Sequence, residues 1–301
     1  MRAKQKQGRD GGLRRPAALA LMLLLCLGAY LACGIWVSYF YPQVRTFQVQ
    51  AEGLEAGVRL AVLSDLHDRR FGGDNAGLVR LVEGQSPDLI LLAGDILNGY
   101  SQGPDTLLEL AEALTGAAPV YFAWGNHELD YLAAGTSDLT AELSALGVTV
   151  LEESFVDLTV NGAELRLGGL YGYAFAMDDY NTCSPANMDP DTYAFLTRFQ
   201  ATGRYKIMVS HRPDSFIFGA ASTTWDVDLV VSGHDHGGQV VLPFLGGLYG
   251  GDQGFFPTYI HGIYEKDGLT LAITSGLGTQ KERLPRFADP PEIMVLDLIP
   301  A

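Results

Sequence analysis

The chain has 301 residues, of which 48% are apolar and 18% are charged, so it can bury a core and lacks the composition of a disordered protein. Its 35 acidic and 20 basic side chains give a net charge of −15. No nucleic-acid partner is expected, because a phosphate-binding surface needs a basic stripe. The three cysteines, Cys26, Cys33 and Cys183, are too few and too scattered for a disulfide framework.

The amino-terminal segment is first basic and then apolar. Residues 1–16 hold six basic side chains against Asp10, a balance of +5, so the other residues together carry −20. Residues 17–40 carry no charge, and as a helix they would be about 36 Å long, enough for a bilayer core of about 30 Å. Basic residues before this run and aromatic residues in its second half predict a cytoplasmic tail at 1–16 and a single-pass transmembrane anchor at 17–40.

Three export signals are alternatives to a retained anchor. The run also fits the apolar region of a cleaved signal peptide, Cys33 lies where a lipoprotein signal would be cleaved, and Arg14-Arg15 is a weak match to a twin-arginine signal. All of these alternatives export the domain. The expected location is therefore the extracytoplasmic side of the cell membrane, or outside the cell after signal cleavage.

Residues 41–57 are expected to be a connector, and residues 58–301 a single α/β domain with no linker-like break. In its first half, short apolar runs alternate with amphipathic stretches. Strands are expected at 58–65, 88–95 and 119–128, and helices near 74–85, 104–115 and 137–146. Each of these strands ends in polar residues, and ligands collect at the carboxyl ends of parallel strands.

The second half contains a clear hairpin signal. Asn161-Gly162 predicts a two-residue turn, and the sheet is expected to become antiparallel there. A loop is expected at 174–190 and a helix at 191–203. Further strands are expected at 205–211, 226–236, 269–276 and 292–299.

Five of the six histidines lie within a residue or two of the carboxyl end of an expected strand, together with three oxygen donors. These residues are His67, His127, His211, His234, His236, Asp65, Asp95 and Asn126. Nitrogen and oxygen donors without thiolate suit Mn, Fe or Zn, and their number predicts two divalent metal ions. The sixth histidine, His261, lies outside every motif and is expected to be structural.

Taken in order, the motifs Asp65-Leu66-His67, Gly94-Asp95, Gly125-Asn126-His127-Glu128, His211 and Gly233-His234-Asp235-His236 resemble those of the calcineurin-like metallophosphoesterase superfamily. The stretches LSDLH, PDLILLAGD, GNHE, SGHDHGGQVVLPF and the Gly-Leu-Gly-Thr at 276–279 resemble its YkuE-like phosphodiesterase branch. The resemblance runs from about Val58 to Leu298. It implies a four-layer αββα sandwich of two mixed β-sheets, preceded here by the transmembrane helix.

The resemblance also implies a division of the ligands. Asp65, His67, Asp95 and His236 would bind the first metal, and Asp95, Asn126, His211 and His234 the second. Asp95 would bridge the pair, since two close cations need a shared anionic oxygen. The spacing of His234 and His236 predicts that both imidazoles lie on one side of an extended segment, with Asp235 pointing away.

The implied reaction is in-line attack on phosphorus by a metal-bridging hydroxide. His127 is by resemblance the catalytic residue that stabilises the phosphoryl group or donates a proton to the leaving oxygen. The chain departs from many members of the family at Asn98, which replaces the acid that orients this histidine. An amide stabilises an imidazolium less than a carboxylate does, so general-acid assistance by His127 is expected to be weaker.

The function expected is phosphoester hydrolysis, most simply of a diester, on a membrane or cell-envelope substrate, with a lipid-linked phosphoester as one candidate. The alternatives are a phosphomonoesterase with a soluble substrate and an inactive, metal-stabilised binding protein on the membrane. Arg69, Arg70 and Arg212 are candidate contacts for a substrate phosphate. The apolar, glycine-rich run at 242–257 is either a core hairpin or a rim that contacts a lipid tail or the membrane.

Overall fold

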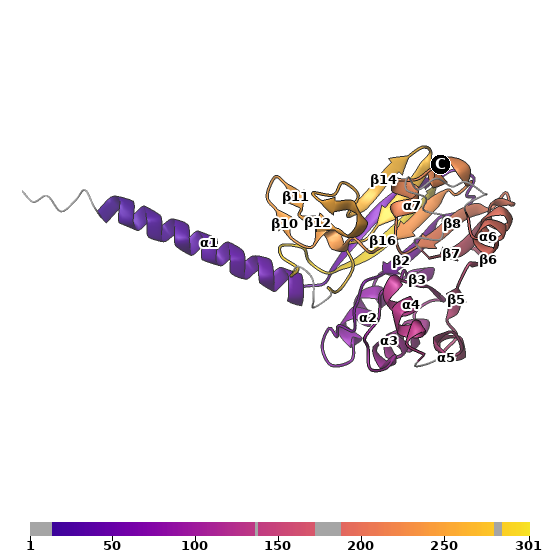
Figure 1. The fold of residues 1–301 in the computed structure, drawn as a ribbon, viewed down its shortest axis with the longest axis horizontal. Coiled ribbons are helices and arrows are strands. Elements are labelled where there is room, and N and C mark those ends of the chain that lie inside the picture. Colours follow the sequence, from indigo (N-terminus) through magenta and orange to yellow (C-terminus); the bar gives the residue numbers. More distant parts are fainter. Residues whose placement is uncertain (1–13, 136–137, 172–187, 280–284) are drawn as a thin grey trace, which may run out of the picture.

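The computed structural model describes residues 14–135, 138–171, 188–279 and 285–301. Its first element, α1 (Arg14–Phe40), projects away from the rest of the chain (Figure 1). Over Pro16–Phe40 this helix is long and apolar enough to cross a membrane, and nearly all of it lies outside the folded domain. The apolar run is therefore helical, as a membrane span or a signal sequence requires. Residues 1–13 of the basic tail, and Cys183, lie outside the described residues.

The first sheet has the strand order β1-β16-β2-β3-β4-β5. Its strands are β1 (Gln43–Ala51), β2 (Val58–Leu63), β3 (Leu89–Leu92), β4 (Val120–Ala123), β5 (Thr149–Leu151) and β16 (Glu292–Pro300). Neighbours from β2 to β5 are parallel, whereas β16 runs antiparallel to β2 and parallel to β1. Helices α2 (Ala76–Glu83), α3 (Asp105–Thr115), α4 (Asn126–Ala133) and α5 (Leu139–Ala145) lie between these strands in the chain, close to where the sequence places three of them.

The connector expected at 41–57 is instead a strand over most of its length. β1 pairs with β16 along nine residues, from Gln43 opposite Glu292 to Ala51 opposite Pro300. It lies at the edge of the sheet, where Phe47, Val49 and Ala51 face the interior and the residues between them are exposed. Such a half-buried strand has an alternating pattern and not the continuous apolar run of a buried strand. The folded domain therefore begins before Val58.

The second sheet has the order β14-β15-β9-β8-β7-β6. Its strands are β6 (Ser154–Val160), β7 (Ala163–Leu170), β8 (Tyr205–Ser210), β9 (Leu229–Ser232), β14 (Gly262–Lys266) and β15 (Leu269–Ile273). The predicted hairpin joins β6 to β7, with Asn161 and Gly162 at φ 52° and 96°. The sheet does not become antiparallel beyond it, because β7, β8, β9 and β15 are parallel neighbours. Only the hairpins at its two edges are antiparallel.

Three apolar layers hold the two sheets and the helices together. One lies between the sheets, and the other two lie between each sheet and its helices. Along β2, Leu60 and Val62 belong to the layer between the sheets, and Ala61 and Leu63 to the helix-facing layer. The second sheet is covered by α6 (Pro190–Gln200), α7 (Asp214–Ile217) and α8 (Ala221–Thr224). The arrangement is the four-layer αββα sandwich that the resemblance implies. The expected loop at 174–190 falls mostly outside the described residues.

The segment between β9 and β14 forms two short hairpins. They consist of the 3-10 turn η1 (His236–Gly238), β10 (Val241–Leu242), β11 (Gly246–Gly247), β12 (Tyr249–Gly250), the 3-10 turn η2 (Gly251–Gln253) and β13 (Gly254–Phe255). The four large apolar side chains Phe244, Leu245, Phe255 and Phe256 are exposed. A core hairpin, one of the two possibilities for this run, is therefore excluded for these side chains.

Candidate metal centre

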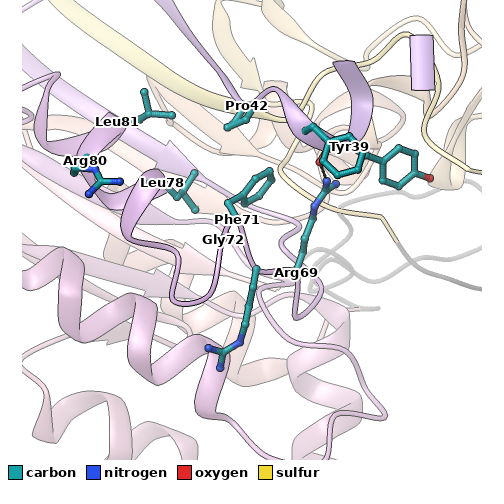
Figure 2. A pocket seen from close by; sticks show the side chains of 11 residues that line it. Tyr39, Pro42, Arg69, Phe71, Gly72, Leu78, Arg80 and Leu81 are labelled. Atoms are coloured by element: carbon teal, nitrogen blue, oxygen red, sulfur yellow. Dashed lines mark hydrogen bonds between the residues drawn. The ribbon is translucent and has the colours of Figure 1, made fainter. Parts of the chain in front are cut away.

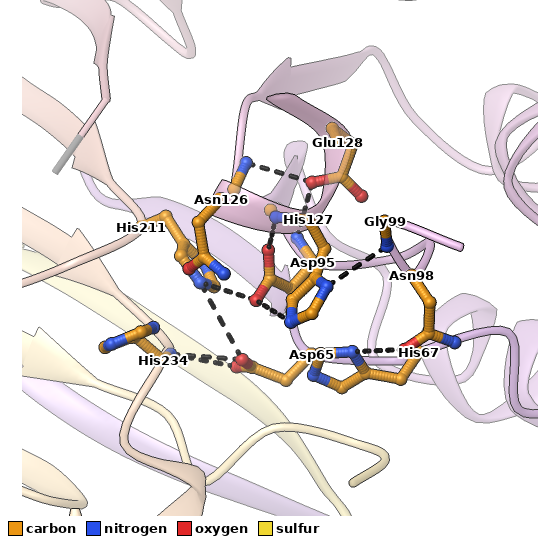
Figure 3. A network of polar contacts seen from close by, with 12 residues as sticks. Asp65, His67, Asp95, Asn98, Gly99, Asn126, His127, Glu128, His211 and His234 are labelled. Carbon is orange, nitrogen blue, oxygen red and sulfur yellow. Dashed lines mark hydrogen bonds and ion pairs between the residues drawn. The ribbon is translucent and has the colours of Figure 1, made fainter. Parts of the chain in front are cut away.

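The residues expected to bind metal lie in loops that follow five strands. Asp65 and His67 follow β2, Asp95 follows β3, Asn126 begins α4 after β4, His211 follows β8, and His234 and His236 follow β9. Each strand belongs to a parallel stretch of its sheet, so the carboxyl ends collect these side chains in one place (Figure 3). All seven are buried or nearly so.

Among the described residues, four groups of side chains have donor atoms close enough to hold an ion, and two of them consist only of the residues expected to bind metal. Asp65, His67 and His236 form the first, and Asp95, His211 and His234 form the second, with the donor atoms of each group within 4.8 Å of one another. Asp95 also groups with His67 and His127, so its carboxylate lies between the two sets. This is where a ligand shared by two ions is expected. Asp214, His234 and Asp252 form the fourth group. The side chain of Asn126 lies beside His211 in Figure 3, on the side of the second group.

The backbone of these loops is locally strained. Asp65, His67, Asp95, His234 and His236 have φ between 45° and 72°, the left-handed region that side chains other than glycine rarely adopt. Each such residue costs on the order of 1–3 kcal/mol and persists only where its surroundings enforce it. Strain concentrated in one cluster of donors is typical of a functional site.

Hydrogen bonds set the tautomers of two histidines. The Nδ1 of His67 lies 3.1 Å from Asn98 Oδ1, and the Nδ1 of His211 lies 2.7 Å from the carbonyl oxygen of Ala93. Since both partners can only accept, each Nδ1 donates, and in the neutral imidazole the lone pair is on Nε2, which is directed into the cluster. His67 Nε2 is buried and has no hydrogen-bond partner among the described residues. A metal ion bound here would supply the partner that this atom lacks.

His234 and His236, the two histidines that follow β9, also each have a ring nitrogen available for a metal. The Nε2 of His234 lies 3.0 Å from Asp252 Oδ2, which leaves its Nδ1 as the donor atom for a metal. The Nδ1 of His236 is buried without a partner, and its Nε2 lies 3.6 Å from Asp65 Oδ1. Asp252 comes from the hairpin segment. Sequence reasoning missed it because it lies 16 residues beyond His236, outside every motif.

The spacing of His234 and His236 suggested an extended segment, but the structure shows that they do not lie on one. His234 has φ 72°, and His236 begins the 3-10 turn η1. The two imidazoles still reach different groups, because the chain turns between them. Asp235 joins neither group; its Oδ2 accepts from Gln253 Nε2 at 2.9 Å.

His127 has the opposite tautomer. Its Nδ1 accepts the backbone N–H of Gly99 at 3.1 Å, so its proton is on Nε2, which lies 3.9 Å from Asp95 Oδ2. A protonated Nε2 cannot bind a metal but can donate to an oxygen between itself and the ligands. The geometry therefore separates His127 from the histidines that suit a metal.

Asn98 does not orient His127, contrary to the expectation from its place in the sequence. Its Oδ1 accepts from His67, and its Nδ2 donates to Asp68 Oδ2 at 2.7 Å. The next residue, Gly99, contacts His127 instead, through its backbone. Replacement of the acid by an amide at this position therefore acts on His67, one of the expected metal ligands.

Burial and mutual charge set the protonation of the site. Burial raises the pKa of Asp65 to about 6, and lowers the pKa of His67 to about 3 and that of His234 to about 4. Burial alone would lower the pKa of His211, but Asp95 raises it to about 9. His211 Nε2 lies 3.1 Å from Asp95 Oδ2. Metal binding by His211 and Asp95 would displace the proton that they share.

A buried carboxylate holds the loop of Asp95 in place. Glu128, in the first turn of α4, accepts the backbone N–H groups of Asp95, Leu97 and Gly125 at 2.8, 2.9 and 2.9 Å. Asp95 Oδ1 in turn accepts the backbone N–H of His127 at 2.9 Å. The Gly-Asn-His-Glu motif thus positions the bridging carboxylate as well as supplying side chains to the site.

The Gly-Leu-Gly-Thr stretch at 276–279 lies against the first metal motif. Leu277 N–H donates to the carbonyl oxygen of Ser64 at 3.0 Å, and Gly278 N–H to that of Asp65 at 2.6 Å. A Cβ at Gly278 would lie 2.2 Å from the carbonyl oxygen of Leu66. Only glycine allows this approach, so the stretch supports the backbone that carries Asp65.

The three arginine candidates have different surroundings. Arg69 donates to the carbonyl oxygen of Tyr39 at the end of α1, and its guanidinium lies between the rings of Tyr39 and Phe71 (Figure 2). Arg70 pairs with Glu109 at 2.7 Å. Arg212 alone lies at the site: its Nη1 is 3.1 Å from Asp252 Oδ2 and its Nε is 3.4 Å from Asn126 Oδ1. Arg69 is thus turned toward α1.

His261 lies apart from the cluster. Its Nε2 is 2.5 Å from Glu292 Oε2 and 3.1 Å from Arg45 Nη1, and its ring packs edge-on against Phe47. It joins β1 to β16 and has the structural place that the sequence suggested for it.

The fold and the site define a class of protein, a phosphoester hydrolase built on a sandwich of two mixed sheets. A family model described as calcineurin-like phosphoesterase matches residues 58–238, more than half of the chain. The chain belongs to this family. Metal binding is a property of that family, and the two donor groups found here fit it.

Among curated proteins, the chain is 28% identical to the metallophosphoesterase YkuE of Bacillus subtilis, over 80% of this chain and 79% of the relative. It is 27% identical to the phosphodiesterase YaeI of Escherichia coli, over 81% and 83%. A metallophosphoesterase of Campylobacter jejuni is 27% identical over 85% of this chain, which spans only 63% of that relative. These relatives confirm the YkuE-like branch. A solved dimetal phosphatase from Danio rerio is 14% identical, with a TM-score of 0.43 over 73% of this chain and 87% of its own.

Proposed function

We propose that this protein is a dinuclear metal-dependent phosphodiesterase that acts outside the cytoplasm on a membrane or cell-envelope substrate. The observation that carries the proposal is the pair of donor groups that share Asp95, with imidazole tautomers matched to metal binding. Asp65, His67 and His236 would hold one ion with Asp95. Asn126, His211 and His234 would hold the other. Mn, Fe and Zn all suit these nitrogen and oxygen donors.

Bound divalent ions would lower the pKa of water toward neutrality and offset the charge of a phosphoryl group. The chain's own part is to hold the carboxylates and imidazoles in place before substrate arrives. Glu128 fixes the Asp95 loop, Asn98 fixes His67 and Asp252 fixes His234. Because these supporting groups are themselves buried or hydrogen-bonded, little reorganisation is needed when the phosphoester binds.

His127 is proposed to donate its Nε2 proton toward a phosphoryl or leaving-group oxygen. The backbone N–H of Gly99 donates to Nδ1, and this contact fixes the proton on Nε2. His127 would therefore act mainly as a hydrogen-bond donor. Arg212, held by Asp252 beside Asn126, is the candidate that contacts a phosphate oxygen.

The location of the reaction is proposed from the amino-terminal segment. α1 is long and apolar enough to be a span, and the basic residues that precede it favour a cytoplasmic amino terminus. The domain then faces the other side of the membrane, where a lipid-linked or envelope phosphodiester is within reach. Cleavage of α1 as a signal sequence would free the same domain on the same side.

Turnover of bis(p-nitrophenyl) phosphate by the purified full chain tests the activity. We expect hydrolysis that depends on added Mn²⁺ and is lost in Asp95→Asn, which keeps the side-chain shape but removes the shared charge. Phosphomonoester and phosphodiester substrates compared side by side separate the diesterase from a soluble-substrate phosphomonoesterase. Full-length protein that binds Mn²⁺ yet hydrolyses neither class would support the inactive binding protein instead.

A further inference from the structure

Four large apolar side chains are exposed in the hairpin segment that follows His236. Phe244 is fully exposed, and Leu245, Phe255 and Phe256 are between 57% and 69% exposed. They belong to neighbouring hairpins: Phe256 donates its N–H to the carbonyl oxygen of Leu248, between β11 and β12. We call these four residues the apolar face. Exposed apolar groups gathered in this way mark a contact surface.

Two of the four residues have an unfavourable backbone conformation. Phe244 has φ 68° and Phe256 has φ 55°, a region that bulky side chains avoid. Burial does not offset the cost of this conformation at either residue, because both side chains are exposed. Backbone strain that is not repaid by packing is expected where the exposed side chains have a function.

The apolar face is attached to the domain end of α1 through one segment. The ring of Phe287 contacts that of Tyr30 at 5.4 Å, and Ala288 N–H donates to the carbonyl oxygen of Gly34 at 3.1 Å. On its other side, Phe287 exchanges hydrogen bonds with Gln239 and Val241 at the base of the first hairpin. Figure 1 shows β10 and β11 beside the end of α1 where it joins the domain. These contacts therefore fix the position of the hairpins relative to α1.

Charge around the end of α1 differs from that of the domain as a whole. Residues 237–257 contain one charged residue, Asp252, and it contacts His234 and Arg212 at the metal centre. Near the same end of α1 is a cavity of about 560 Å³ whose lining has three arginines and no carboxylate (Figure 2). Its lining residues are Tyr39, Phe40, Pro42, Arg69, Arg70, Phe71, Gly72, Gly77, Leu78, Arg80 and Leu81. Apolar and basic groups together suit a bilayer with anionic headgroups.

We propose that the apolar face docks into the headgroup region of the membrane that α1 spans, and that the phosphoester reaching the metal centre is therefore carried by a lipid. The docking segment begins directly after His236 and supplies Asp252 to His234, so one segment serves both the membrane contact and the metal centre. This inference rests on the proposed function and names its substrate class.

The contact is tested without activity by electron paramagnetic resonance. The full chain, with Cys26, Cys33 and Cys183 replaced by serine, carries a nitroxide at Phe244→Cys or, as the matched control, at Phe218→Cys. Phe218 is 54% exposed and ends α7, which lies away from α1 in Figure 1. Nanodiscs of phosphatidylcholine and phosphatidylglycerol hold one chain each.

At position 244 we expect oxygen to relax the label more than a water-soluble nickel chelate does, and at position 218 the reverse. Equal access of the nickel chelate to both positions would overturn the proposal. Shielding of position 244 only in discs that hold two chains would assign the face to a second copy, and would also overturn it.

Enzyme activity provides the second test of the docking proposal. In the same nanodiscs, Phe244→Asp/Phe255→Asp is expected to lose about tenfold or more in turnover of hexadecyl p-nitrophenyl phosphate, because burial of such side chains contributes on that order. Turnover of bis(p-nitrophenyl) phosphate, which has the same leaving group and is soluble, is expected to be unchanged. Equal losses on both substrates would contradict the docking role. Absence of bis(p-nitrophenyl) phosphate hydrolysis by the wild type would instead contradict the proposed function.

Discussion

Asn98 and Gly99 are adjacent in the chain, yet they set two histidines in opposite tautomers. The Asn98 amide oxygen accepts from His67 and leaves that ring a lone pair for metal, whereas the Gly99 N–H donates to His127 and leaves that ring a proton. At the scale of single residues, the division between metal ligand and proton donor is therefore made by these partners. Two substitutions separate the roles.

His127→Ala removes the proposed donor without removing a ligand. We expect kcat with bis(p-nitrophenyl) phosphate to fall by about 10²–10³, the range of a lost general acid or donor, while bound Mn²⁺ stays at the wild-type level. Metal content by mass spectrometry and steady-state kinetics are the measurements. An unchanged kcat, or loss of bound metal, would show that the role assigned to His127 is wrong.

Asn98→Ala instead removes the hydrogen bond that orients the His67 ring. A ligand that loses its supporting hydrogen bond commonly loses about 10–100-fold in metal affinity, so activity is expected to need more Mn²⁺ and to recover largely at saturation. Gln102→Ala, an exposed change in the same loop, is the control. If the Mn²⁺ dependence of Asn98→Ala matches that of the control, the contact to His67 does not support the metal.

At the scale of elements, close packing of the two sheets brings the strand ends together. Gly169 in β7 faces β5 so closely that a Cβ there would lie 2.2 Å from the carbonyl oxygen of Leu151. Gly169→Ala is expected to lower stability by roughly 1–3 kcal/mol. Thermal unfolding measures this, with Gly203→Ala as the matched control because no atom lies within 4 Å of a Cβ there. Equal unfolding temperatures for the two variants would contradict the packing argument.

Elements with a continuous apolar run could be predicted from the sequence, and so could the polar residues at their ends. The sequence does not predict β1, because an edge strand alternates exposed and buried residues and has no continuous apolar run. It also does not predict that β7, β8 and β9 are parallel, because a hairpin turn shows only how its own two strands pair. The ligand residues follow from strand ends. The contact of Asp252 with His234 and that of Asn98 with His67 do not, since they depend on how a distant hairpin and a loop return to the site.

At the scale of the whole molecule, we expect metal binding to be coupled to folding. The centre buries Asp65 and Asp95 near each other, and cations that bind only the folded chain stabilise it. Mn²⁺ at 100 times its dissociation constant adds about 2.7 kcal/mol per site, or roughly 5–10 °C in apparent Tm. Differential scanning fluorimetry with Mn²⁺ or EDTA measures the shift. A Tm that is indifferent to EDTA would mean that no metal holds the folded centre.

Electron paramagnetic resonance of the Mn²⁺-loaded full chain tests most directly whether Asp95 joins two metal ions. The expected result is two Mn²⁺ per chain with the multiline spectrum of an exchange-coupled pair about 3.5–4 Å apart, and loss of that coupling in Asp95→Asn. One Mn²⁺ per wild-type chain, or a coupled spectrum that survives Asp95→Asn, would contradict the shared carboxylate.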